Sequence, residues 1–288
     1  MNLNSDIEER YVKINGVSLH VVLAGPEGAP PLMLLHGFPD FWYGWKNIIS
    51  GLKDEFRLVV PDLKGFNLSD KPTQVEEYDL KILVEDIKHL SEKLELDTFN
   101  LAGHDWGGVI AWAVAEKYPD TINKLIILNA PHYKVFRDKI EKNKSQRKAS
   151  GYISQLIKDG SDELLMRDDF QMLRFATFQN ARNKGAFSEE DKAMYLDAWS
   201  QPKALKTSVH YYRANRRYED WTGKIHVPTL VIFGMKDNYV KPVVLEGLSD
   251  YVGDLKIVKS EDSSHWVMHD DPELVISSIR DFVLKGDG

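Results

Sequence analysis

Four uninterrupted apolar runs occur in the first half of the chain, and segments with helical periodicity at 80–94 and 109–117 separate the later ones. The runs are PLMLLHG at 31–37, FRLVVPD at 56–62, FNLAGHD at 99–105 and INKLIILNA at 122–130. Such runs, each ending in turn residues, are typical of strands that are covered on both faces, as in a parallel sheet. The alternation therefore predicts an α/β fold built on a mostly parallel sheet.

Further strands are expected at both ends of the chain. Asn15-Gly16 lies between two β-rich segments, and this dipeptide favours the tight turn of a hairpin. The expected elements at the two ends are strands at 11–14, 18–23, 229–235 and 255–260 and a final helix at 272–284. Together with the four central runs they predict an eight-stranded sheet flanked by helices.

The alternation is interrupted between residues 132 and 220. This segment is charged, largely helical in pattern, and contains no comparable apolar run. We therefore predict an α/β core formed by 1–131 and 221–288. The segment 132–220 is expected to form a helical cap, or lid, inserted after the sixth strand.

Composition excludes several classes of protein. The 288 residues carry a formal net charge of -7, which argues against a nucleic-acid or anionic-membrane binder. The sequence contains no cysteine, which excludes disulfides, thiolate catalysis and zinc–thiolate sites. The first ten residues lack the apolar segment of a secretory signal, and no stretch approaches about eighteen uncharged apolar residues. We therefore expect a soluble, cytoplasmic protein without a membrane span.

The sequence LAGHDWGG at 101–108 joins a predicted strand to a predicted helix. Small residues flank one reactive side chain, Asp105. A nucleophile elbow requires this pattern, because its central residue adopts a strained turn with close neighbours. A second interpretation is an ordinary turn in which Asp105 caps the helix. The local sequence alone leaves both interpretations open.

Five motifs in combination resemble the epoxide hydrolase branch of the α/β-hydrolase superfamily. They are HGFPDFWYGW at 36–45, DLKGFNLSDKP at 62–72, GHDWGG at 103–108, GMKD at 234–237 and SSHW at 263–266. The resemblance covers nearly the whole chain, with the motifs in the expected order. It implies an α/β-hydrolase fold with Asp105 as the nucleophile. GHDWGG is shared with haloalkane dehalogenases, so this motif alone does not indicate the substrate.

An aspartate nucleophile has a chemical consequence. A carboxylate is ionised at neutral pH without the help of a base, and it can displace a leaving group from saturated carbon. Water must then attack the carbonyl of the resulting alkyl ester, a step that needs a base and an oxyanion site. A serine would form an ether that water does not readily cleave. Asp105 therefore points to epoxides or alkyl halides rather than to ordinary esters.

The resemblance also implies the partners of this nucleophile. The hydrolase order of nucleophile, acid and histidine makes His265 the base and Asp237 the residue that orients it. Among the nine histidines, the nearest competitors of His265 are His36, His104 and His269. The first two of these belong to packing and turn motifs of the superfamily, which favours His265.

The acid and the oxyanion site each have an alternative interpretation. Some relatives place the acid after the sixth strand, where this chain has the uncharged Asn129, and Asp237 could instead cap a helix. The oxyanion site is expected to consist of the backbone N–H groups of Phe38 and Trp106. The alternative role of Trp106 is core packing. The Phe38–Pro39 bond is a candidate cis peptide.

The cap is where epoxide hydrolases and dehalogenases differ. Opening an epoxide needs a proton donor at the departing oxygen, and the resemblance implies that two cap tyrosines supply it. QRKASGY at 146–152 and HYYR at 210–213 resemble the two regions, which assigns Tyr152 and Tyr212. Tyr211 is the main rival of Tyr212. Any of the twelve tyrosines has packing as its alternative role.

These residues together predict hydrolysis of an epoxide to a vicinal diol. The expected partners are a small hydrophobic epoxide and water, in an apolar pocket near Trp42, Phe136 and Trp266. No metal or organic cofactor is implied, because carboxylate, imidazole and phenol suffice. The alternative is a haloalkane dehalogenase with the same triad. A more remote one is a non-catalytic binding protein on the same scaffold.

Overall fold

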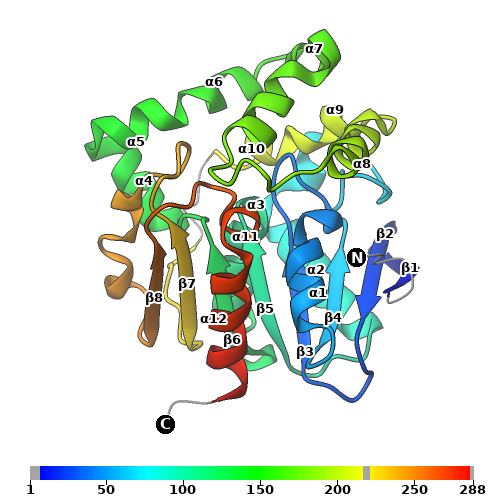
Figure 1. Ribbon diagram of the computed structural model, residues 1–288, viewed down its shortest axis with the longest axis vertical. Helices are drawn as coiled ribbons and strands as arrows, with labels where there is room; N and C mark the ends of the chain where they lie inside the picture. Colours follow the sequence, from blue (N-terminus) through cyan, green and yellow to red (C-terminus); the bar gives the residue numbers. More distant parts are fainter. Residues whose placement is uncertain (1–6, 217–220, 286–288) are drawn as a thin grey trace.

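The computed structural model describes residues 7–216 and 221–285 and has the predicted α/β architecture (Figure 1). Its strands are β1 (Ile7–Ile14), β2 (Val17–Ala24), β3 (Pro31–Leu35), β4 (Arg57–Pro61), β5 (Phe99–His104), β6 (Ile122–Leu128), β7 (Thr229–Gly234) and β8 (Leu255–Ser260). They form an eight-stranded sheet in the order β1-β2-β4-β3-β5-β6-β7-β8. β2 pairs antiparallel with β1 and β4, and the other neighbours pair in parallel.

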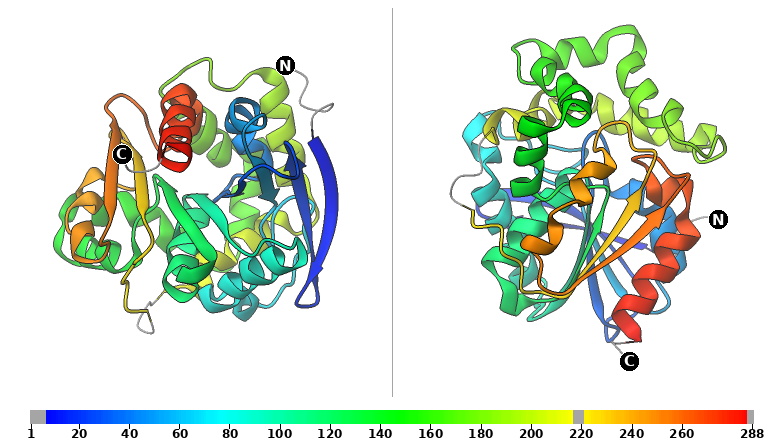
Figure 2. Two further views of the ribbon diagram at one scale, coloured as in Figure 1. Left: turned by 90° about the horizontal axis from the view of Figure 1, so that it is seen from below. Right: turned by 90° about the vertical axis from the view of Figure 1, so that its left-hand side faces the viewer.

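Helices cover both faces of this sheet. They are α1 (Lys46–Leu52), α2 (Leu80–Lys93), α3 (Trp106–Lys117), α11 (Val267–Asp270) and α12 (Pro272–Leu284). α1 and α12 lie on one face, and α2 and α3 lie on the other (Figure 2). Because both faces are covered, every residue of β5 and β7 is buried. This burial is why those strands are largely apolar runs in the sequence.

The hairpin at the start of the chain is confirmed, but its strands are longer than predicted. The turn at Asn15-Gly16 has positive φ values of 43° and 85°, which only asparagine, aspartate and glycine adopt readily. β1 begins at Ile7 rather than near Tyr11. The sequence pattern did not indicate the first half of β1, because this partly exposed edge strand carries the charged residues Glu8, Glu9 and Arg10 there.

A set of helices lies between β6 and β7 in the sequence and above one end of the sheet in Figure 1. We call these helices the cap. They are α4 (Tyr133–Lys142), α5 (Lys144–Ala149), α6 (Ile153–Leu156), α7 (Ser161–Arg174), α8 (Glu189–Ser200), α9 (Ala204–Ser208) and α10 (His210–Ala214). A π-helical turn at Phe175–Gln179 follows α7. The division at 132 and 220 stays a prediction, and residue 220 lies outside the described residues. No helix in the described part of the chain is both long and apolar enough to cross a membrane.

A buried ion pair fastens α2 to the loop that follows β4. Lys64 Nζ lies 2.7 Å from Asp86 Oδ2, and the two side chains are only 2% and 4% exposed. Burial raises the pKa of Asp86, although the charge of Lys64 opposes that rise. Each charge in such a pair depends on the other, because neither retains water to solvate it.

Replacing Asp86 with alanine should lower the free energy of unfolding by about 3 kcal/mol. The Lys64 ammonium would stay buried, with only the more distant Glu77 carboxylate, 3.8 Å away, as a counter-charge. Urea denaturation measures this loss. Glu92→Ala is the matched control, because it breaks an exposed pair with Lys88 in the same helix and should cost less than about 0.5 kcal/mol. Equal losses in the two variants would contradict the role of burial.

Candidate active site

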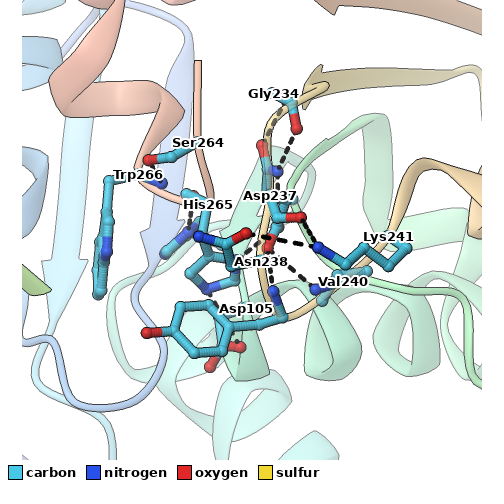
Figure 3. Close-up of polar contacts among 12 residues, drawn as sticks. Asp105, Gly234, Asp237, Asn238, Val240, Lys241, Ser264, His265 and Trp266 are labelled. Carbon is cyan, nitrogen blue, oxygen red and sulfur yellow. Dashed lines mark hydrogen bonds and ion pairs between the residues drawn. The ribbon is translucent and has the colours of Figure 1, made fainter. Parts of the chain in front are cut away.

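Three polar side chains follow strands in the parallel part of the sheet. Asp105 comes directly after β5, Asp237 comes three residues after β7, and His265 lies in the loop after β8. Because the carboxyl ends of parallel strands share one edge of a sheet, these loops converge. Figure 3 shows His265 between Asp105 and Asp237. The structure thus brings together the nucleophile, acid and base that the sequence predicts.

The turn at Asp105 has the geometry of an elbow. Asp105 has φ 50° and ψ -122° and makes no side-chain capping hydrogen bond to α3, so a helix-cap role does not account for it. Neighbouring backbone packs so closely that a Cβ at Gly107 would lie 2.2 Å from the Leu35 carbonyl oxygen. A Cβ at Gly37 would lie 2.4 Å from that of Asp105. The small residues of the motif are therefore required by sterics.

His265 bridges the two carboxylates. Its Nδ1 lies 2.8 Å from Asp237 Oδ2, and its Nε2 lies 3.5 Å from Asp105 Oδ2. Burial would lower the pKa of His265, but the charges of Asp237 and Asp105 and its hydrogen bonds to them raise it to about 10. The imidazole is therefore protonated at neutral pH while Asp105 is ionised.

The Asp237 carboxylate is fully occupied by hydrogen bonds. Its Oδ1 accepts from the backbone N–H groups of Tyr239 at 2.7 Å and Val240 at 3.0 Å. Its Oδ2 accepts from His265 and from Asn129 Nδ2, the latter at 2.9 Å. Asn129, which occupies the alternative acid position, thus supports Asp237 as a donor. A carboxylate held by this many donors orients the imidazole but has no lone pair free to attack a substrate.

Asp105 is held more loosely. Its Oδ1 accepts the backbone N–H of Phe38 at 2.9 Å, and the Phe38–Pro39 bond is cis, as expected. Trp106, the other expected oxyanion donor, is the first residue of α3, where backbone N–H groups have no partner within the helix. Burial would raise the pKa of Asp105, but the hydrogen bond and charge of His265 outweigh burial and lower it. The carboxylate is therefore ionised while it faces open space.

Two cavities meet at Asp105. One of about 590 Å³ is lined by Asp105, His265 and Trp266, and the other, of about 570 Å³, is lined by Asp105 and Trp106. Residues that line both cavities are Asp105, Tyr152 and Tyr212. The cap thus covers Asp105 with two tyrosines.

The two cap tyrosines lie against each other, with ring centroids 6.1 Å apart. Burial and the charge of Asp105 raise the pKa of both phenols above the ordinary tyrosine value, so both carry a proton to donate. Their rival Tyr211 lines neither cavity, and its hydroxyl donates to the Lys64 carbonyl.

The expected pocket residues divide into three cases. Trp266 lines the first cavity and Phe136 lines the second. The prediction for Trp42 is wrong, since it lines neither. Its side chain is 6% exposed and packs edge-on against Phe41 and Tyr43 in a 3₁₀ turn.

The competing histidines have structural partners. His36 Nε2 accepts the backbone N–H of Leu63 at 2.9 Å, and His104 Nε2 lies 2.8 Å from the His265 carbonyl oxygen. His269 is buried and faces the Tyr195 hydroxyl. Burial lowers the pKa of each of these imidazoles, so they are neutral. None of them lines either cavity at Asp105.

Tyr239 lies at the site although no sequence pattern singled it out. It lines the first cavity, and its ring centroid lies 5.4 Å from that of His265 and 5.6 Å from that of Tyr152. Its only signal in the sequence is its position two residues after Asp237. Within the described ranges, no group of three or more histidine and acidic side chains is arranged to hold a metal ion.

Comparisons with known proteins agree with this geometry. Residues 30–272 match the family model described as the alpha/beta hydrolase fold. The chain is 34% identical to the AB hydrolase superfamily protein YfhM of Bacillus subtilis, over 95% of this chain and 97% of that protein. It is also 34% identical to Epoxide hydrolase 1 of Caenorhabditis elegans, over 96% of this chain and 70% of that protein.

A solved structure extends these matches. An epoxide hydrolase from Bacillus megaterium aligns with a TM-score of 0.89 and 32% identity, covering 95% of this chain and 99% of that one. The chain belongs to the α/β-hydrolase fold family and, within it, to the epoxide hydrolases.

Proposed function

We propose that the protein hydrolyses small hydrophobic epoxides to vicinal diols through a covalent ester on Asp105. The observation that carries this proposal is the position of Tyr152 and Tyr212, two protonated phenols that line both cavities at an ionised carboxylate. Halide needs no proton when it departs, whereas an epoxide oxygen does. A mutant of the related enzyme from Bacillus megaterium has been crystallised with its product, a naphthyloxy-propane-1,2-diol.

In the first step, Asp105 attacks one ring carbon and the carbon–oxygen bond of the epoxide breaks. The departing oxygen takes a proton from Tyr152 or Tyr212, so no free alkoxide forms in the apolar cavity. The phenolate left by the first step regains its proton from the His265 imidazolium, which becomes neutral. In the second step, water attacks the carbonyl carbon of the ester while the neutral His265 accepts its proton. The N–H of Phe38 stabilises the oxyanion. The diol leaves, and the proton taken from water stays on His265, so the protonated imidazole and the ionised Asp105 of the resting site are restored.

The charges of the site fit this order of steps. Ester formation removes the negative charge of Asp105, which is one of the causes that raise the pKa of His265. His265 therefore becomes a stronger acid after the first step and loses its proton more readily. The neutral imidazole, which can act as a base, thus forms after the ester has formed. Asp237 continues to orient this neutral ring through its hydrogen bond to Nδ1.

His265→Gln should separate the two steps. The first step does not need the imidazole as a base, so a covalent adduct should accumulate on Asp105. Mass spectrometry of intact protein after brief exposure to styrene oxide should show the mass of the protein plus one substrate. The control, Asp105→Ala, should show no added mass. Recovery of only unmodified His265→Gln protein would contradict the covalent mechanism.

Asp105→Asn should lower the pKa of His265 well below 10. The sign follows from charge, since the negative carboxylate favours the protonated imidazole and the neutral amide does not. An NMR titration of ¹³C-labelled histidine Cε1 measures the pKa in the two proteins. His132 is an internal control, because burial lowers its pKa to about 4 and neither Asp105 nor His265 is among the groups that shift it. An unchanged pKa of His265 would contradict the proposed coupling.

Tyr152→Phe and Tyr212→Phe should each slow ring opening only partly, because the remaining phenol still donates. The loss should lie within the roughly 10²–10⁴-fold scale of one acid catalyst. Removing both should cost far more, because the alkoxide would then form without a donor. Single-turnover consumption of styrene oxide measures the rate.

Two controls make this experiment specific. Tyr211→Phe, whose hydroxyl bonds to the Lys64 carbonyl, should react at close to the wild-type rate. Release of bromide from 1-bromobutane tests the alternative, because a haloalkane dehalogenase would be nearly indifferent to loss of both phenols. A double variant that opens the epoxide as fast as wild type would overturn the assignment of Tyr152 and Tyr212.

A further inference from the structure

A buried amide side chain joins the cap to the loop that carries Asp237. Gln146, in α5, is 0% exposed. Its Nε2 donates to the Tyr239 carbonyl at 2.9 Å, and its Oε1 accepts the Lys241 backbone N–H at 2.7 Å. Its Nε2 also donates to Ser150 Oγ at 2.9 Å. One amide therefore hydrogen-bonds to two backbone groups of the core, which belong to residues two positions apart, and to one hydroxyl of the cap.

A second amide repeats this pattern at the other end of the cap. Asn215, directly after α10, is 8% exposed. Its Oδ1 accepts the Leu80 backbone N–H at 2.7 Å, and its Nδ2 donates to the Tyr78 carbonyl at 2.8 Å. Its Nδ2 also donates to the Tyr211 carbonyl of the cap at 2.9 Å. Again two core peptide groups, two residues apart, and one cap group share a single side chain.

Each amide is close in sequence to one of the tyrosines above Asp105. Ser150, the cap partner of Gln146, precedes Tyr152 by two residues, and the Tyr152 ring packs on Tyr239, whose carbonyl Gln146 holds. Tyr211, the cap partner of Asn215, directly precedes Tyr212. Asn215 also lines the second cavity, whereas Gln146 lines neither cavity.

We propose that Gln146 and Asn215 are positioning residues, each of which fixes one tyrosine over Asp105, Gln146 fixing Tyr152 and Asn215 fixing Tyr212. This inference rests on the proposed function. An amide suits the role because it offers a donor and an acceptor in one plane, and each of the two amides meets one backbone C=O and one backbone N–H of the core. A residue that cannot supply both leaves buried peptide groups without partners, and the cap segment then shifts relative to the core.

The test is a pair of crossed double-mutant cycles on ring opening. Gln146→Met and Asn215→Leu keep approximate side-chain size and remove the hydrogen bonds. Each is combined with Tyr152→Phe and separately with Tyr212→Phe. The rate is single-turnover consumption of styrene oxide by excess enzyme, and circular dichroism checks folding. If either apolar variant does not fold, Gln146→Glu or Asn215→Asp replaces it, because each keeps the acceptor and loses the donor.

The expected result is a specific pattern of coupling. Gln146→Met alone should slow ring opening about 10-fold, since a misplaced catalytic group costs rate steeply. In the Tyr152→Phe background, adding Gln146→Met should change the rate of ring opening by no more than about 2-fold. In the Tyr212→Phe background, Gln146→Met should keep its full effect on the rate. Asn215→Leu should show the opposite pattern. Tyr43→Phe removes a cap–core hydrogen bond to Asp191 and serves as the control, with no coupling to either tyrosine.

The possible outcomes separate this inference from the function on which it rests. The same loss in every tyrosine background would mean that the amides only stabilise the cap, and would overturn the inference. Coupling of Gln146 to Tyr212, or of Asn215 to Tyr152, would also overturn it. If Tyr152→Phe and Tyr212→Phe themselves leave ring opening unchanged, the proposed role of the phenols fails instead.

Discussion

The rest of the site depends on keeping one largely buried carboxylate ionised. Asp105 is 9% exposed and its backbone lies in a strained conformation, yet its pKa is lowered. Burial opposes this state, so His265 and the Phe38 N–H must counter it. The elbow, the Phe38 N–H and the loop after β8 all meet at this carboxylate.

A second buried carboxylate makes the arrangement asymmetric. Asp237 is satisfied by Asn129, His265 and two backbone N–H groups, whereas Asp105 keeps an open side toward the cavities. Two acids that share one histidine therefore suit the two proposed roles, Asp105 as nucleophile and Asp237 as the residue that orients His265. The difference lies in how many donors each carboxylate has, not in the residue type.

Sequence reasoning recovered the parts of the molecule that local pattern encodes. Buried strands such as β5 and β7 are largely apolar because both faces are covered, and the elbow requires small residues around Asp105. The first half of β1 escaped prediction because its charged residues lie at an exposed edge. Trp42 was misplaced because a motif defines its neighbours in the chain but not the face on which its side chain packs.

The contacts that escaped sequence reasoning are long-range and polar. Gln146 meets Tyr239 across 93 residues, and Asn215 meets Tyr78 across 137. A single amide has no periodicity that would reveal such a partner. Asn129 stood out only as an uncharged residue at an alternative acid position, and its hydrogen bond to Asp237 emerges from the register of β6 against β7.

The insertion of the cap between β6 and β7 has a consequence for chain entropy. These adjacent parallel strands pair although the whole segment 129–228 lies between them. The entropy lost on closing a flexible loop rises only with the logarithm of its length, so doubling such a segment costs about 0.6 kcal/mol. The sheet is therefore nearly insensitive to the length of the cap. Insertions or deletions there can reshape the cavities above Asp105 while the pairing that positions the carboxylate stays the same.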